Sequence, residues 1–196
     1  KDLLNKLNLD HNTQLVMAIA SSLDSKRKGM DLLIESIHSF NKHYNNVRPV
    51  KFLFVGNKNT SDHKIPDNCI MLGRIDSTEL LREAYSAADL FVIPSREDNL
   101  PNTVLEAFAC GTPAIGFNIG GIPDMIEDNK NGYLVAPYNT DEMAKRMAEY
   151  LASEQNVKQK FSQHAVDTVE QKFSLNLQAE RYIQVFNQMD KNAIKS

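Results

Sequence analysis

The chain has 196 residues, of which 42% are hydrophobic and 24% charged, and its formal net charge is −3. This composition is that of one well-cored globular domain and excludes a disordered or disulfide-stapled chain. It also argues against nucleic acid as a partner, because apart from the cluster Lys26-Arg27-Lys28 the basic residues are dispersed. Cys69 and Cys110 are expected to be reduced thiols of a cytoplasmic protein. No apolar run reaches the ~18 residues of a membrane span.

Short apolar runs alternate with longer amphipathic stretches, which indicates βα units and a parallel sheet. The expected strands are 14–20, 50–55, 69–72, 90–93, 113–117 and 132–135. The expected helices are 30–41, 77–87 and 103–110, with a short turn near 123–127, followed by three helices over 140–153, 157–172 and 175–190. The pattern predicts one α/β domain, Rossmann-like, with three α/β/α layers, a six-stranded parallel sheet and C-terminal helices.

Three loops that follow expected strands have unusual sequences. Residues 21–29 carry the basic cluster and end where a helix begins, residues 94–102 read PSREDNLPN, and residues 118–123 contain Gly120-Gly121. Glycines tolerate positive φ and let the backbone approach a ligand closely. Because ligands of open parallel sheets bind beyond the carboxyl ends of the strands, we expect these loops to meet at one ligand-binding edge.

Glu106 has two interpretations. If Thr103 is the N-cap of the helix, Thr103 and Glu106 form a capping box. If Asn102 is the N-cap, the Glu106 carboxylate is free of the backbone. The first-turn N–H groups then face the shared edge, where they suit a phosphate, and the carboxylate is left to bind sugar hydroxyls.

The other charged residues of these loops have alternatives as well. Asp98 is either a solvated loop acid beside Glu97 or a second sugar-binding carboxylate. Lys28 and Arg27 are either solvated or neutralise a diphosphate, and Arg96 either adds to that charge or pairs with Glu97. The five histidines have no metal-ligand spacing and the chain has no D-x-D pair, so no metal and no other cofactor is expected.

The segment PSREDNLPNTVLEAFACGTPAIGFNIGGIPDMI resembles the donor-binding core of retaining family-4 glycosyltransferases of the GT-B fold. Those enzymes carry an acid-x7-acid motif in this loop and helix, a Lys-Gly pair at the first helix and a Gly-Gly-x-Pro turn. The similarity runs from LVMAIASSLDSKRKGMDLLIESI through LGRIDSTELLREAYSAADLFVIPS to FSLNLQAERYIQVFNQM, which is nearly the whole chain.

The resemblance implies roles for individual residues. Glu106 would hold the ribose of a nucleotide diphosphate sugar, and Asp98 would meet the transferred sugar; these two acids are the implied catalytic residues. The implied donor-binding residues are Ser22, Arg27, Lys28, Gly73, Ile75, Asn99, Leu100, Pro101, Asn102, Thr103, Gly120 and Gly121. Two positions depart from the family: its first acid is usually Glu rather than the shorter Asp98, and its frequent Arg after the first strand is Ser22 here, so that Arg27 is the candidate replacement.

The resemblance also implies an architecture and an activity. GT-B enzymes have two Rossmann-like domains, and KDLLNKLNLD resembles the start of the second. Residues 1–196 are therefore expected to be the C-terminal nucleotide-sugar-binding domain without the N-terminal acceptor domain, toward which the last helix would present an apolar face.

The parent enzyme is expected to transfer a hexose from a nucleotide diphosphate sugar, such as a UDP-sugar, to an acceptor hydroxyl, with retention and without a metal. Its expected place is bacterial surface polysaccharide synthesis, in the cytoplasm or peripherally at the inner face of the membrane. Two alternatives are a nucleotide-sugar epimerase of the GT-B fold and a non-catalytic α/β module that docks a protein partner.

Overall fold

The computed structural model describes residues 2–22, 25–44, 48–57 and 65–193. These residues contain a six-stranded sheet in the order β3-β2-β1-β4-β5-β6, in which every neighbouring pair is parallel. The strands are β1 (Gln14–Ser22), β2 (Val50–Asn57), β3 (Cys69–Gly73), β4 (Leu90–Ile93), β5 (Ala114–Phe117) and β6 (Gly132–Val135). The predicted six-stranded parallel sheet is confirmed.

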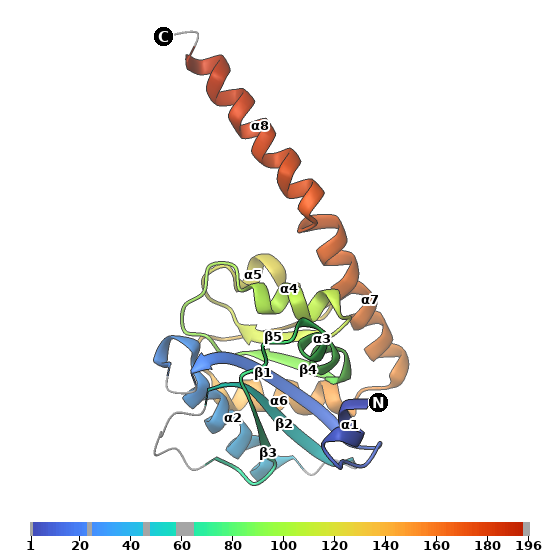
Figure 1. Ribbon diagram of the computed structural model, residues 1–196. Coiled ribbons are helices and arrows are strands. Elements are labelled where there is room, and N and C mark those ends of the chain that lie inside the picture. Colours follow the sequence, from blue (N-terminus) through green and yellow to red (C-terminus); the bar gives the residue numbers. More distant parts are fainter. Residues whose placement is uncertain (1, 23–24, 45–47, 58–64, 194–196) are drawn as a thin grey trace.

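Helices cover both faces of this sheet, which confirms the three-layer Rossmann-like architecture. Figure 1 shows α2 and α6 on one side and α3, α4 and α5 on the other. The helical elements are α1 (Asp2–Lys6), the 3-10 turn η1 (Lys26–Lys28), α2 (Met30–His43), α3 (Thr78–Ala87), α4 (Asn102–Ala109), α5 (Ile122–Met125), α6 (Thr140–Ala152), α7 (Gln155–Lys172) and α8 (Leu175–Ala193).

The strands read as continuous apolar runs because both of their faces are buried. Successive side chains of a strand point to opposite faces of the sheet. In β1, Val16 and Ala18 pack into the core beneath α2 and α6, whereas Leu15 and Met17 pack into the core beneath α3 and α4. Each strand therefore needs apolar residues at consecutive positions, which is what parallel sheets covered on both sides require.

The elements differ from the expected ones mainly at their ends. β1 continues past the apolar run to Ser22, which pairs in register with Asn57 after an irregularity in the ladder. Ser22 was predicted to lie in the loop over residues 21–29, but it is the last residue of strand β1. Backbone ladder bonds do not depend on side-chain polarity, so the end of an apolar run does not mark the end of a strand. At the N-terminus, Asp2–Lys6 form the short helix α1.

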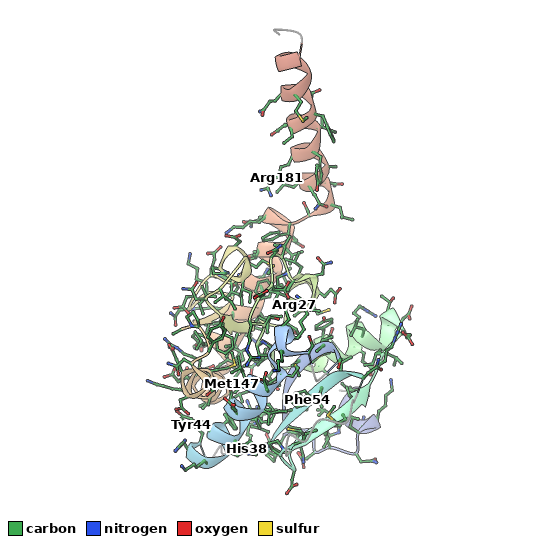
Figure 2. The ribbon with its side chains drawn as sticks, turned by 90° about the vertical axis from the view of Figure 1, so that its left-hand side faces the viewer. Arg27, His38, Tyr44, Phe54, Met147 and Arg181 are labelled. Atoms are coloured by element: carbon green, nitrogen blue, oxygen red, sulfur yellow. The ribbon has the colours of Figure 1, made fainter. Side chains whose placement is uncertain are left out.

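Helix α8 projects away from the rest of the domain (Figure 1). Its large apolar side chains are exposed, among them Leu175, Tyr182, Ile183, Phe186 and Met189. Figure 2 places Arg181 on this projecting segment, well apart from the labelled residues of the domain. The expected exposed apolar face of the last helix is confirmed.

Two expectations from composition also have an outcome. Cys69 and Cys110 are both free thiols, as predicted. Among the described residues, no helix combines the length and the apolar character that crossing a membrane requires.

Candidate functional site

The loop that contains η1 packs directly on the loop that follows β4. The backbone N–H of Arg96 donates to the carbonyl of Arg27 at 2.8 Å, and the Arg96 guanidinium donates to the carbonyl of Lys26 at 2.7 Å. Gly29 lies so close to Pro94 that an added Cβ would stand 1.9 Å from the Pro94 carbonyl oxygen. Figure 2 shows Arg27 near one end of α2, with Tyr44 at the other. The close approach of residue 29 to the Pro94 carbonyl therefore requires glycine directly after the basic cluster.

The third loop, before α5, closes on the same place. The backbone N–H of Gly121 donates to the carbonyl of Asp98 at 2.9 Å, and a Cβ on Gly121 would stand 1.4 Å from the carbonyl oxygen of Asn99. The predicted convergence of the three loops at the carboxyl edge is confirmed. The close approach that Gly121 permits is made to the chain's own backbone, whereas the sequence suggested an approach to a ligand.

Lys28 and Asp98 form an ion pair at the junction of these loops. The Lys28 Nζ lies 2.7 Å from the Asp98 Oδ2, and the two side chains are only 20% and 12% exposed. The Arg27 guanidinium approaches the same oxygen at 3.9 Å, and the Ser95 hydroxyl donates to it at 3.4 Å. The interpretation of Asp98 as a solvated loop acid is therefore wrong, because two cations and a hydroxyl surround its carboxylate.

Arg96, in the same loop as Asp98, forms an ion pair with Asp31. Its guanidinium donates two hydrogen bonds to the Asp31 carboxylate, both at 2.7 Å. Hydrogen bonding to Arg96 holds the pKa of Asp31 below its ordinary value. Pairing of Arg96 with Glu97 was wrong, since Asp31 in the first turn of α2 offers a bidentate partner. Arg96 thereby ties η1 and α2 to the loop that carries Asp98.

Helix α4 begins in a way that neither capping interpretation anticipated. Its N-cap is Pro101, with φ −68°, and the helix starts at Asn102 without a side-chain cap. The backbone N–H of Val104 donates to the Pro101 carbonyl at 2.9 Å. Thr103 is thus two residues past the N-cap, too far inside the helix to cap it, and the capping box with Glu106 does not form.

The Thr103 hydroxyl is left in an unusual position by this start. Its Oγ1 is buried and has no hydrogen-bond partner among the described residues. A buried polar atom without a partner costs about 1–3 kcal/mol. The first turn of α4 therefore holds an unsatisfied hydroxyl next to the junction of the loops.

The Glu106 carboxylate accepts a hydrogen bond from the Tyr85 hydroxyl at 2.8 Å. Tyr85 comes from α3 and is 2% exposed, whereas Glu106 itself is an exposed residue. Within the described residues, Glu106 makes no hydrogen bond to Asp98 or Lys28. Sequence reasoning missed both Tyr85 and Asp31, because each occupies an ordinary position of an amphipathic helix and its partner lies far along the chain.

The remaining predicted residues lie along the same edge. Ile75 lines a cavity of about 320 Å³ at the carboxyl ends of β1 and β2, together with Ile19, Ala20, Val55, Gly56, Asn57, Arg74 and Leu81. Gly73 ends β3, with φ 69°. Asn99, Leu100, Asn102 and Gly120 are exposed around the loop junction, whereas Pro101 is buried.

Two larger hollows open at the other edge of the sheet. One, of about 470 Å³, lies beside Pro49, Val50 and Asn68, and another, of about 500 Å³, lies beside Asp89 and Pro113. All these residues are at or just before the amino ends of strands, whereas ligands of open parallel sheets bind at the carboxyl ends. In the described parts of the chain, no three His, Cys, Asp or Glu side chains are grouped to hold a metal ion.

Comparisons with known proteins agree with this architecture. A family model described as Glycosyl transferases group 1 matches residues 4–167. The D-inositol 3-phosphate glycosyltransferase of Mycobacteroides abscessus is 36% identical over 73 residues, which is 37% of this chain and 16% of that enzyme.

Solved structures share the fold. Sucrose-phosphate synthase from Thermosynechococcus elongatus superposes with a TM-score of 0.78 at 24% identity, over 97% of this chain and 49% of that one. Anabaena HepE, in complex with UDP and glucose, superposes with a TM-score of 0.77 at 18% identity, over 95% and 51%. The chain spans about half the length of these two proteins. Because the family model covers most of its residues, the chain belongs to the group 1 glycosyl transferases.

Proposed function

We propose that residues 1–196 form the C-terminal, nucleotide-sugar-binding domain of a glycosyltransferase that moves a hexose from a nucleotide diphosphate sugar to an acceptor hydroxyl with retention. The observation that carries this proposal is the convergence of three loops around the Lys28–Asp98 pair at the carboxyl edge of the sheet. That edge combines fixed positive charge with carboxylates, which suits a ligand made of phosphates and hydroxyls.

The diphosphate is assigned to Lys28, Arg27 and the first turn of α4. The Lys28 and Arg27 side chains both approach the Asp98 carboxylate. In the described chain no side chain caps α4, so that of its first-turn N–H groups only that of Val104 has a partner, and those of Asn102 and Thr103 are free. A helix N-terminus attracts anions through these groups and through its dipole. A hydrogen bond to a charged group contributes roughly 1.5–3 kcal/mol, so several such contacts are sufficient for binding.

The buried Thr103 hydroxyl supports the same assignment. It has no partner in the described chain, yet it lies in the first turn of α4. A phosphate oxygen at this helix end would accept its hydrogen bond and remove the cost of leaving it unsatisfied.

The nucleoside is assigned to the neighbouring part of the edge. The base would enter the cavity lined by Ile75, beyond the last residue of β3, Gly73, and the ribose hydroxyls would bind the Glu106 carboxylate. The transferred sugar would then reach Asp98 and the backbone from Asn99 to Asn102.

In the proposed reaction, negative charge develops on the leaving diphosphate while the sugar becomes oxocarbenium-like. Lys28 and Arg27 are held by contacts made before any substrate binds, so they stabilise that charge without reorganisation. This contribution is made by the chain's own cations, and we propose that the reaction needs no metal. Asp98 and Glu106 would orient the donor.

The acceptor is assigned to a separate N-terminal domain, against which the exposed apolar face of α8 would pack. The parent enzyme is proposed to act in bacterial surface polysaccharide synthesis, in the cytoplasm or at the inner membrane face. An acid pair that serves only as a helix cap, as a docking module would have, is disfavoured because Glu106 caps nothing.

Calorimetry with UDP, GDP and ADP tests the proposal. We expect residues 1–196 to bind at least one of the three. No heat with any of the three at millimolar concentration would contradict the proposed function.

A further inference from the structure

Tyr85 is an aromatic core side chain whose polar end meets an acid of the proposed donor site. Its ring packs against Phe91 with the centroids 5.7 Å apart and the planes at 60°. Its backbone carbonyl accepts a hydrogen bond from the buried hydroxyl of Thr112 at 2.7 Å. Its own hydroxyl donates to the Glu106 Oε2 at 2.8 Å. A rigid core residue therefore holds the end of a side chain that belongs to an exposed residue.

Without the hydrogen bond from Tyr85, the Glu106 side chain would be free to rotate until a ligand binds. A Glu side chain has three rotatable bonds and loses considerable rotamer entropy when it is fixed. In the described chain, the Tyr85 hydroxyl is the hydrogen-bond donor to the Glu106 carboxylate. Since Tyr85 is itself held by packing, it can fix the carboxylate before a ligand arrives, and preorganised groups bind with a smaller entropic cost.

We propose that Tyr85 is a positioning residue, which holds one carboxylate oxygen of Glu106 so that the other oxygen is presented to the ribose hydroxyls of the nucleotide. The inference rests on the proposed function, because the ribose role of Glu106 is part of it. It adds a residue to the site that lies in the core, below the surface that the nucleotide touches.

The protonation state of the phenol suits this role. Burial, and after it the hydrogen bond to Glu106, raise the pKa of Tyr85 above its ordinary value. The Tyr85 hydroxyl therefore keeps its proton, and stays a donor, throughout the physiological range.

The test is the single-atom deletion Tyr85→Phe, measured by calorimetry with UDP and with 2′,3′-dideoxy-UDP. We expect Y85F to weaken UDP binding about fivefold, since a hydrogen bond that orients a charged group is lost. Binding of the dideoxy analogue should change less than twofold, because it has no ribose hydroxyls for Glu106 to hold. A purely structural role would weaken both ligands equally.

Two further variants make the test specific. Tyr150→Phe is the matched control, since Tyr150 is equally buried but lies in α6 within the other core cluster, and it should leave the binding of both ligands unchanged. In a Glu106→Gln background, which itself weakens UDP binding, Y85F should add little, because the charged acceptor is gone. Should Y85F melt too early for titration, the Tyr85 hydroxyl proton of the wild-type chain can be followed by NMR. It should shift on binding of UDP but not of the dideoxy analogue, and equal shifts with both ligands would contradict the positioning role.

The outcomes separate the inference from the proposed function. If wild type binds UDP, and E106Q lowers the affinity for UDP while Y85F does not, the proposed positioning role of Tyr85 is wrong but the proposed donor site is retained. If Y85F weakens UDP and the dideoxy analogue alike, Tyr85 is structural only. If wild type binds no nucleoside diphosphate, both the function and the inference fail.

Discussion

The Nζ of Lys28 lies 2.7 Å from the Oδ2 of Asp98, although the two residues are 70 positions apart in the chain. Both side chains are largely withdrawn from solvent, so each compensates the other's charge. A diphosphate that reaches Lys28 therefore enters a place where Asp98 already supplies a negative charge. Because of this coupling, we expect the loss of the Asp98 charge to raise the affinity for UDP and to lower the affinity gained from the sugar of a UDP-hexose.

Replacing Asp98 with Asn should tighten the binding of UDP and weaken the additional affinity that a UDP-hexose gains from its sugar. The substitution removes a negative charge beside the phosphates, which we expect to improve UDP binding about threefold to tenfold. It also removes the proposed carboxylate contact to the sugar. Calorimetry with UDP and with UDP-glucose measures both effects. Glu97→Gln, at the exposed neighbouring acid, is the control and should alter neither; equal weakening of both ligands by D98N would contradict this account.

Replacing Lys28 with Gln should weaken UDP binding at least about tenfold, because one charged contact to the diphosphate is lost. Uridine, which has no phosphate, should bind as it does to wild type. Lys26→Gln is matched in charge and lies in the same turn, but the Lys26 side chain is exposed, and we expect less than a twofold effect. An equal loss in K28Q and K26Q would mean that only the general charge of the turn matters.

The Arg96–Asp31 pair should position the cationic turn. Asp31→Asn removes the acceptor of two hydrogen bonds at 2.7 Å, and we expect UDP binding to fall about threefold to tenfold with a loss of stability of about 1–2 kcal/mol. Glu83→Gln breaks the Lys6–Glu83 ion pair between α1 and α3, and should leave UDP affinity unchanged. Titrations of UDP together with urea denaturation distinguish the two; D31N with wild-type affinity would show that Lys28 is positioned without Arg96.

Replacing Thr103 with Val should separate binding from stability. The methyl group replaces a buried hydroxyl that lacks a partner, so the free energy of unfolding should stay the same or rise by about 1 kcal/mol. UDP affinity should fall about threefold or more, since the proposed hydrogen bond to phosphate is lost. Thr140→Val, at the start of α6, serves as the control for binding. Unchanged UDP affinity in T103V would remove Thr103 from the site.

Glu127 should make stability depend on pH in the acid range. Its hydrogen bonds, first with Lys172 and then with Lys130, lower its pKa from 4.5 to about 2. A lowered carboxyl pKa stabilises the fold above the unfolded value near 4.5, and this stabilisation is lost as the pH falls toward 2. Because the side chain is 33% exposed, we expect solvent screening to limit the contribution to about 0.5–1 kcal/mol.

The corresponding measurement is urea denaturation of Glu127→Gln and wild type between pH 7 and pH 2. The variant should be less stable at pH 7, and the two curves should meet as the pH approaches 2. A constant difference over the whole range would show that packing, rather than charge, is what the substitution removes.

The architecture could be predicted from the sequence because a sheet covered on both faces imposes its pattern on short stretches of the chain. Runs such as LFVI over residues 90–93 must be buried on both faces, and the alternation with amphipathic helices predicts their parallel order. The loops after the strands then meet by topology alone. For the same reason, the proximity of Lys28 to the loop of Asp98 could be anticipated, although the direct ion pair was not.

The contacts that fix the site's side chains could not be predicted, because they join elements far apart in the chain. Nothing at position 85 distinguishes a core tyrosine from one whose hydroxyl reaches Glu106, and nothing at position 31 identifies Arg96 as its partner. The start of α4 was missed for a local reason. Thr103 and Glu106 have the spacing of a capping box, but Pro101 already occupies the N-cap.

The central claim is that the carboxyl edge of the sheet, around Lys28, Asp98 and Glu106, binds a nucleoside diphosphate. The most direct measurement is a titration of the ¹⁵N-labelled chain with UDP, followed through the assigned backbone amide signals. We predict that the amides of Lys28, Gly29, Asn102, Thr103 and Gly121 shift in a saturable way, together with those beside Ile75. Saturable shifts confined to the opposite edge of the sheet, beside Val50 or Pro113, or no shifts at millimolar UDP, would contradict the account.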